Sequence, residues 1–139
     1  MIVLDTNVLS ELMRPEPNAR VLRWLGEQPA TRVFTTSITQ AEILHGMVLL
    51  PAGKRRDALE AAAKAMFEEE FEGRVLAFDS AAAPAYAAIA RDRRRAGRPI
   101  SHFDAQIAAI ATIHEAAVAT RNAADFDGCG IAVVDPWQD

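Results

Sequence analysis

The sequence is short of several features that mark common classes of protein. It contains one cysteine, Cys129, so no disulfide can form within the chain, and a reducing cytosol fits this composition. No apolar run reaches the roughly 18 residues that a membrane-spanning helix needs. The first residues show neither the basic leader nor the apolar stretch of a signal peptide. We therefore expect a soluble, cytoplasmic protein with no membrane partner.

Lysine is also scarce, and acids outnumber basic residues by 19 to 15. The only lysines are Lys54 and Lys64, and the formal net charge is −4 at pH 7. This charge argues against a protein that coats nucleic acid through overall positive charge. A nuclease stays compatible with it, because a group of acids that holds a metal ion also lowers the net charge.

The length and the apolar content bound the fold. The 139 residues suit one domain, 1–139, with a single core. Half of the residues are hydrophobic, and alanine supplies many of these. Because alanine lets helices pack closely, a helix-rich domain is favoured.

Short apolar runs alternate with helical patterns along the chain. The predicted strands are residues 1–4, 32–35, 74–78, 117–120 and 131–134. The predicted helices are residues 6–13, 18–27, 37–50, 54–72, 80–96 and one that begins at Ser101, with a short turn or helix at 122–127. This alternation predicts an α/β fold of three layers, in which helices cover both faces of a mostly parallel sheet of about five strands. Helical spacing places Leu22 and His114 among the inward-facing residues.

Two acids follow predicted strands. Asp5 comes directly after the apolar run 1–4, and a charge in that place is costly unless it is paired or bound to metal. Asp125 lies just beyond the strand at 117–120, although it also suits an ordinary turn. In open α/β sheets, ligands gather at the carboxyl ends of the strands. Both acids therefore point to the same edge of the sheet.

Two further acids lie near the starts of predicted helices. Ser37 stands three residues before Gln40, a capping-box spacing, and as N-cap it places Glu42 in the second turn. Ser101 as N-cap places Asp104 at the third helical position, where an acid is also favoured by the helix dipole alone. Helices in such folds begin at the edge where the strands end, so these acids are expected to join the first two.

A cluster of four carboxylates has a chemistry of its own. The charges repel one another, so some of the groups must take up protons or bind a cation. Oxygen ligands suit Mg²⁺ or Mn²⁺. These ions activate a water molecule and offset the charge that builds up on a phosphate. The acids therefore predict metal-dependent hydrolysis of phosphodiester bonds.

The residues around the acids resemble the PIN-domain nucleases, and within them the VapC-type toxins of bacterial toxin–antitoxin pairs, including the FitB-like branch. The resemblance covers nearly the whole chain. Its motifs are Asp5-Thr6-Asn7 with Leu9, Gln40-Ala41-Glu42-Ile43, Gly97-Arg98-Pro99-Ile100-Ser101 leading to Asp104, and Thr120-Arg121-Asn122 with Asp125-Phe126. Any one motif is weak, whereas the four in this order are specific.

The resemblance implies a PIN fold and Mg²⁺- or Mn²⁺-dependent endoribonuclease activity. Carried over to this chain, Asp5 and Asp104 are the main metal ligands, and Glu42 is a third ligand or a group that positions water. Asp125 matches the fourth acid. The polar positions that orient the acids are matched by Asn7 and Thr120.

The resemblance also implies partners. These are a second copy of the chain, an RNA substrate and a small antitoxin. The C-terminal segment of the antitoxin would occupy the active-site groove, and operator DNA would be bound only through the antitoxin's own N-terminal domain. Two other functions stay open from the sequence. One is a degenerate PIN domain that acts without catalysis in a DNA-binding complex, and the other is a housekeeping nuclease that processes RNA.

A basic run precedes Asp104 and has two interpretations. It is either a solvated helix end, where cations suit the dipole, or a rim that binds RNA phosphates beside the acids. The candidate RNA contacts are Arg91, Arg94, Arg95 and Arg98, with Arg93 in the same run. The tryptophans Trp24 and Trp137 are interpreted as core or dimer contacts.

Overall fold

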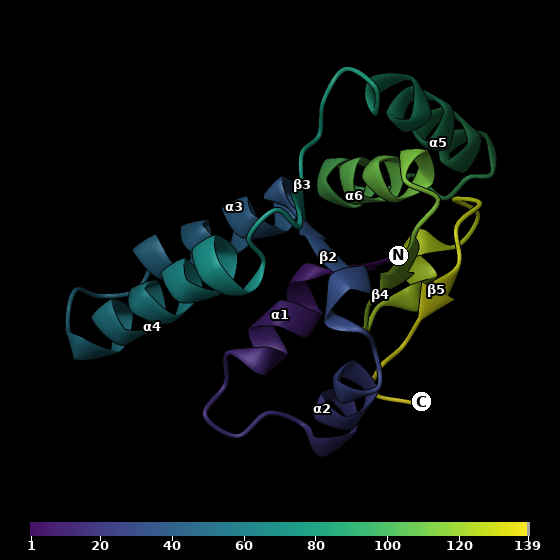
Figure 1. Cartoon of the computed structure of the whole chain (residues 1–139). Coiled ribbons are helices and arrows are strands. Elements are labelled where there is room, and N and C mark those ends of the chain that lie inside the picture. The colour runs from purple at the N-terminus through teal and green to yellow at the C-terminus, as the bar shows by residue number, and fades with distance from the viewer. Residues whose placement is uncertain (139) are drawn as a thin grey trace.

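Five short strands form one all-parallel sheet in the computed structural model of the chain, which describes residues 1–138 (Figure 1). The strands are β1 (Ile2–Leu4), β2 (Val33–Thr36), β3 (Val75–Leu76), β4 (Ala117–Ala119) and β5 (Val133–Val134). Their order is β3-β2-β1-β4-β5. The central strand β1 pairs its residue Val3 with Phe34 of β2 and with Val118 of β4. The predicted α/β fold is confirmed.

Helices cover both faces of this sheet. They are α1 (Thr6–Leu12), α2 (Ala19–Gly26), α3 (Ser37–Val48), α4 (Lys54–Ala65), α5 (Ala83–Arg95) and α6 (His102–Ile113), with short turns η1 (Ala30–Arg32), η2 (Met66–Glu70) and η3 (Ala123–Phe126). Figure 1 shows α5 and α6 on one side of the sheet, α1 and α2 on the other, and α3 with α4 as a hairpin that extends away from it. None of the helices among residues 1–138 is long and apolar enough to cross a membrane.

Successive residues of β1 belong to different cores. Leu4 packs with residues of α1 to α4, including Val8 and Trp24, whereas Val3 packs with residues of α6 and its neighbours, including Ile107. This alternation follows from the strand itself, because consecutive side chains point to opposite faces of a sheet. The strand β1 therefore lies between two apolar layers. Asp5, the residue after it, is the first charged residue at the edge of these layers.

Two caps set where the site-bearing helices begin. Ser101 is the N-cap of α6 as predicted, and its hydroxyl accepts a hydrogen bond from the Asp104 amide at 3.1 Å. The prediction of Ser37 as N-cap of α3 is wrong by one residue. Thr36 has the extended backbone of a cap, and its hydroxyl accepts from the Thr39 amide at 3.1 Å, so Ser37 is already helical.

The structure differs from prediction in the length of the outer strands and in the exposure of two residues. The outer strands β3 and β5 have two residues each instead of the predicted 74–78 and 131–134, because an edge strand pairs on one side only. Leu22 is 46% exposed and not inward, since Val21 and Trp24 define the inner face of α2 and Leu22 lies about 100° round the helix from Val21. His114 caps the end of α6 and is exposed, which contradicts its inward placement.

Candidate active site

One cleft is lined by the four predicted acids, which come from four separate segments, and by a fifth acid that was not predicted, the buried Glu11 of α1, which pairs with Arg14. The cleft has a volume of about 680 Å³ and lies at the carboxyl edge of the sheet. Asp5 follows β1, Glu42 is in α3, Asp104 is in the first turn of α6, and Asp125 is in η3 beyond β4. The structure therefore brings together the four acids that the sequence analysis singled out.

Asp5 is the most tightly held of them. It is 6% exposed and is the N-cap of α1, where its Oδ1 accepts from the Thr6 amide at 2.8 Å. Its Oδ2 accepts from the Thr120 hydroxyl at 2.8 Å and from the Asn7 amide group at 3.3 Å. Asn7 also donates to Thr120 at 3.1 Å. The two polar residues matched by resemblance thus contact the acid directly and fix its orientation.

Glu42 is held through a residue that the sequence analysis did not assign. The Thr6 hydroxyl donates to Glu42 Oε1 at 3.0 Å and lies 3.2 Å from the Thr39 hydroxyl. Thr6 therefore links the start of α1 to the second turn of α3. Thr6 belongs to the motif Asp5-Thr6-Asn7, but its role was not predicted, because its partner Glu42 is 36 residues away and leaves no local pattern.

The electrostatics of the cleft favour a cation. Burial raises the pKa of Asp5, Glu42 and Asp104 above their ordinary values. The pKa of Asp104 is raised further by Asp5 and Asp125 and lowered by Arg93, and hydrogen bonds from Thr120 and Thr6 lower that of Asp5. Within residues 1–138, none of the four acids has a lysine or arginine nitrogen within the 4.0 Å of an ion pair. The two arginines that line the cleft, Arg14 and Arg121, therefore leave these four acids unpaired.

The donor set fits a hard divalent ion. Its groups are carboxylates, with threonine and asparagine oxygens behind them, and these are the ligand types of Mg²⁺ and Mn²⁺. As the side chains stand, no three acidic, histidine or cysteine groups among residues 1–138 already form a closed metal cage. The acids would have to draw together around an ion, which is consistent with the repulsion that now separates them.

Arg93 was predicted on the surface as part of a basic run, and this placement is wrong. It is 7% exposed and reaches from α5 beneath η3. Its Nε donates to the carbonyl of Arg98 and its Nη1 to the carbonyl of Asp125, both at 2.7 Å, and Cys129 Sγ lies 3.7 Å from Nη1. A buried side chain thereby holds the backbone of the segment that carries the fourth acid.

The other arginines of that run stay on the surface but divide into two places. Arg91, Arg94 and Arg95 line a separate hollow on α5, outside the cleft of the acids. Arg98 lies against η3, where it donates to the carbonyl of Ala124 at 3.4 Å and pairs with Asp127 at 3.6 Å. Of these four surface arginines, Arg98 alone therefore contacts the segment that carries Asp125.

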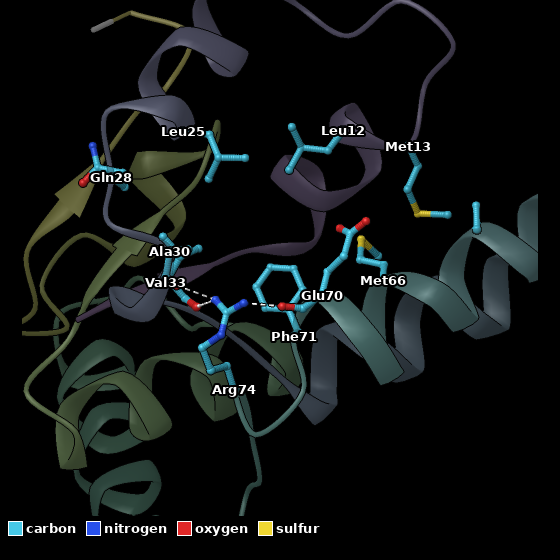
Figure 2. A pocket seen from close by; sticks show the side chains of 11 residues that line it. Leu12, Met13, Leu25, Gln28, Ala30, Val33, Met66, Glu70, Phe71 and Arg74 are labelled. Atoms are coloured by element: carbon cyan, nitrogen blue, oxygen red, sulfur yellow. Dashed lines mark hydrogen bonds between the residues drawn. The ribbon is translucent and has the colours of Figure 1, made fainter.

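Two largely apolar hollows lie outside the cleft, and one of them adjoins it. One, of about 730 Å³, shares Thr6, Ser10, Arg14 and Glu42 with the cleft and is otherwise lined mainly by apolar side chains of α1, α3 and α4. Figure 2 shows the other, of about 420 Å³, where Leu12, Leu25 and Phe71 surround the space and Arg74 donates to the carbonyls of Val33 and Glu70. The first hollow therefore extends apolar surface alongside Glu42, whereas the second shares no residue with the cleft and lies near Val33, at the start of β2.

Comparison with known proteins agrees with this geometry. Residues 2–128 match the PIN domain family, and the chain belongs to that family. It is 42% identical to plasmid stability protein StbB of Pseudomonas syringae pv. tomato, with 99% of each chain covered. It is 40% identical to toxin FitB of Neisseria gonorrhoeae over the full length of both, and 38% identical to VapC ribonuclease Y4jK of Sinorhizobium fredii over 99% of each.

Solved structures give the same result. The chain matches a chain of the FitAB complex bound to an IR36 DNA fragment with a TM-score of 0.92 and 40% identity, covering 99% of this chain and 96% of the other. It matches FitAcB from Neisseria gonorrhoeae with a TM-score of 0.90 and 38% identity over all of both chains. The resemblance to VapC-type PIN toxins of the FitB-like branch is confirmed.

Proposed function

We propose that this chain is an endoribonuclease that uses Mg²⁺ or Mn²⁺ and serves as the toxin of a toxin–antitoxin pair. The observation that carries the proposal is the cleft that Asp5, Glu42, Asp104 and Asp125 line, where none of these four forms an ion pair with a lysine or arginine of residues 1–138. Similarity to a VapC ribonuclease and to toxin FitB supports the same activity. When bound, the divalent ion would lower the pKa of a water molecule and offset charge on the phosphate.

The hydrogen bonds that hold each acid suggest its role in the site. We assign Asp5 and Asp104 as the main ligands, because Asp5 is fixed by Thr120 and Asn7 and Asp104 stands at the capped start of α6. Glu42 completes the site as a ligand or orients the attacking water, since its Oε1 is held by a hydroxyl from Thr6. Asp125, which lies in η3 beyond β4, would be the fourth ligand.

The antitoxin is proposed as a small protein whose C-terminal segment lies in the cleft. The solved relatives are FitAB and FitAcB complexes, one of them bound to DNA. In this chain, a segment that entered the cleft would find apolar surface beside it, at Met13, Ile43 and Met47. Contact with operator DNA would come only through the antitoxin, because this chain has a net charge of −4.

A homodimer is proposed through α3 and the start of α6. Leu44, Val48 and Leu49 are 42%, 55% and 71% exposed on or next to α3. Phe103, 55% exposed, lies beside this helix near Ala41. A second copy would cover these apolar side chains, which are otherwise in water.

Cleavage of RNA by the purified chain tests the activity. Wild type is expected to cut a single-stranded RNA with Mg²⁺ or Mn²⁺ and not with EDTA. Asp5→Asn and Asp104→Asn should each lower kcat/KM by at least about a hundredfold, which corresponds to about 2.7 kcal/mol of lost transition-state stabilisation. Glu72→Gln, the same loss of charge at an exposed position outside the cleft, should cut like wild type.

Two results would contradict the assignment. Retained cleavage in both cleft variants would remove the acids from the mechanism. Absence of cleavage by wild type with every divalent ion, combined with tight binding of an antitoxin, would instead favour a PIN domain that acts without catalysis. Growth arrest on expression of wild type without its partner, relieved by Asp5→Asn, separates a toxin from a housekeeping nuclease.

A further inference from the structure

Arg121 and Trp137 form a pair on the wall of the acidic cleft. Both residues line the cleft together with the four acids. The guanidinium carbon of Arg121 lies 5.0 Å from the centroid of the Trp137 ring, a distance at which the cation is attracted by the aromatic face. The interpretation of Trp137 as a core contact is confirmed, since it packs against the apolar cluster of Leu4, and the structure adds that it also lines the cleft.

The Arg121 guanidinium keeps its hydrogen-bond donors. Within residues 1–138 its side chain makes no hydrogen bond and no ion pair, although it shares a cleft with four acids. Stacking on a ring uses the face of the guanidinium and leaves the N–H groups at its edge available. The other arginine of the cleft, Arg14, is committed, since it pairs with Glu11 at 3.3 Å.

Both members of the pair stand on fixed backbone. The Arg121 amide donates to Asn7 Oδ1 at 3.0 Å, which ties it to the residue that orients Asp5. The Trp137 amide donates to Asp135 at 2.9 Å, its carbonyl accepts from Arg20 at 3.3 Å, and its ring packs against the apolar cluster of Leu4. The ring is therefore a fixed support that limits where the guanidinium can go.

The Arg121 guanidinium is positively charged, has unused hydrogen-bond donors and forms no ion pair with the acids of the cleft among residues 1–138. It is therefore suited to bind an anion. The planar N–H groups of arginine match phosphate oxygens in a bidentate arrangement. If the acids act on one phosphate of an RNA strand, as proposed above, the neighbouring phosphates must lie along the same cleft. We propose that Arg121, supported by Trp137, binds a phosphate of the RNA strand next to the one that is cut.

The test measures binding of an uncleaved strand as a function of salt. A fluorescent ten-nucleotide RNA is titrated with protein in EDTA, so that no cut occurs, at several salt concentrations. Arg121→Gln is expected to weaken binding about tenfold at low salt. It should also reduce the slope of log K against log salt by about 0.7, the value for one lost phosphate contact on a single strand. Arg23→Gln, an exposed arginine on α2 outside the cleft, should change neither.

Variants of Trp137 should affect RNA affinity and its salt dependence differently from Arg121→Gln. Trp137→Leu removes the support but keeps the charge, so binding should weaken severalfold while the salt slope stays near that of wild type. Trp137→Phe keeps an aromatic face and should restore most of the affinity. In cleavage assays Arg121→Gln should raise KM and leave kcat within about twofold, because the contact is the same in ground and transition states.

The inference and the proposed function fail separately. If wild type cuts RNA and Asp5→Asn does not, but Arg121→Gln binds RNA with the affinity and slope of wild type, the phosphate contact is overturned and the nuclease stands. If Arg121→Gln loses binding and slope but wild type never cuts, the contact stands and the nuclease is overturned. A loss of kcat at unchanged KM would also overturn the contact.

Discussion

Replacing Arg93 by methionine tests whether one buried side chain holds the segment of Asp125. Methionine has a similar length and preserves most of the packing of the stem, but it has no donor. The carbonyls of Arg98 and Asp125 each lose a 2.7 Å hydrogen bond from a charged group. Both bonds are part-buried, and a hydrogen bond to a charged group contributes about 1.5–3 kcal/mol.

The expected loss of stability follows from these two bonds. Removing the cost of burying a charge offsets part of it, and Arg93 has no carboxylate within ion-pair distance among residues 1–138. We expect the free energy of unfolding of Arg93→Met to fall by about 2–4 kcal/mol. Since about 1 kcal/mol shifts Tm by roughly 4 °C in a domain of this size, Tm should fall by roughly 8–16 °C.

Thermal melting followed by circular dichroism measures this change. Arg94→Met on the next residue of α5 is the matched control, because that side chain is exposed, and its Tm should stay within about 2 °C of wild type. Hydrogen exchange adds a local readout, since the amides of residues 122–129 should exchange faster in Arg93→Met. A Tm within 2 °C of wild type, with unchanged exchange in that segment, would refute the role of Arg93.

The remaining predictions concern charge in the cleft. Burial raises the folded-state pKa of Asp104 above its unfolded value. Between these two values the folded state binds more protons, so this carboxyl lowers stability as the pH rises and does so fully above the folded value. Metal-free Asp104→Asn should therefore melt a few degrees above wild type at pH 7.5, and the gap should close toward pH 4. Mn²⁺ at a hundred times its Kd should stabilise wild type by about 2.7 kcal/mol and leave Asp104→Asn nearly unchanged. A wild type that melts higher than the variant without metal at pH 7.5 would contradict the first expectation, and equal shifts with Mn²⁺ would contradict the second.

The sequence predicts those parts of the site that have local causes. Asp5 was identifiable because a charge directly after a buried strand needs a partner, and Asp104 because Ser101 marks the start of its helix. The alternation of strands and helices predicted the sheet, and the sheet accounts for the convergence of these acids. The cap of α3 was misplaced by one residue because serine is the more common N-cap and Ser37 has capping-box spacing to Gln40, whereas the folded chain uses Thr36.

The parts that could not be predicted depend on contacts distant in sequence. Arg93 lies in a run of arginines that all read as solvent-facing, and only the packing of α5 against η3 buries this one. Trp137 lines the cleft because it follows β5, which lies beside β4 and ends at the same edge of the sheet. Trp137 has no spacing or neighbour that distinguishes it along the chain. Arg93 does have one, because it stands four residues after Ile89 and shares the buried face of α5 with it.

The position of Asp5 at the start of α1 affects how loss-of-function variants should be read. The same carboxylate that faces the cleft also caps the helix through the Thr6 amide. Alanine at this position would remove both the charge and the cap, and the lost cap alone costs about 1 kcal/mol. Asparagine keeps an oxygen that can accept the same bond. An inactive Asp5→Ala protein would confound impaired chemistry with a frayed helix, whereas Asp5→Asn keeps the cap and loses only the charge and the Oδ2 acceptor of Thr120 and Asn7.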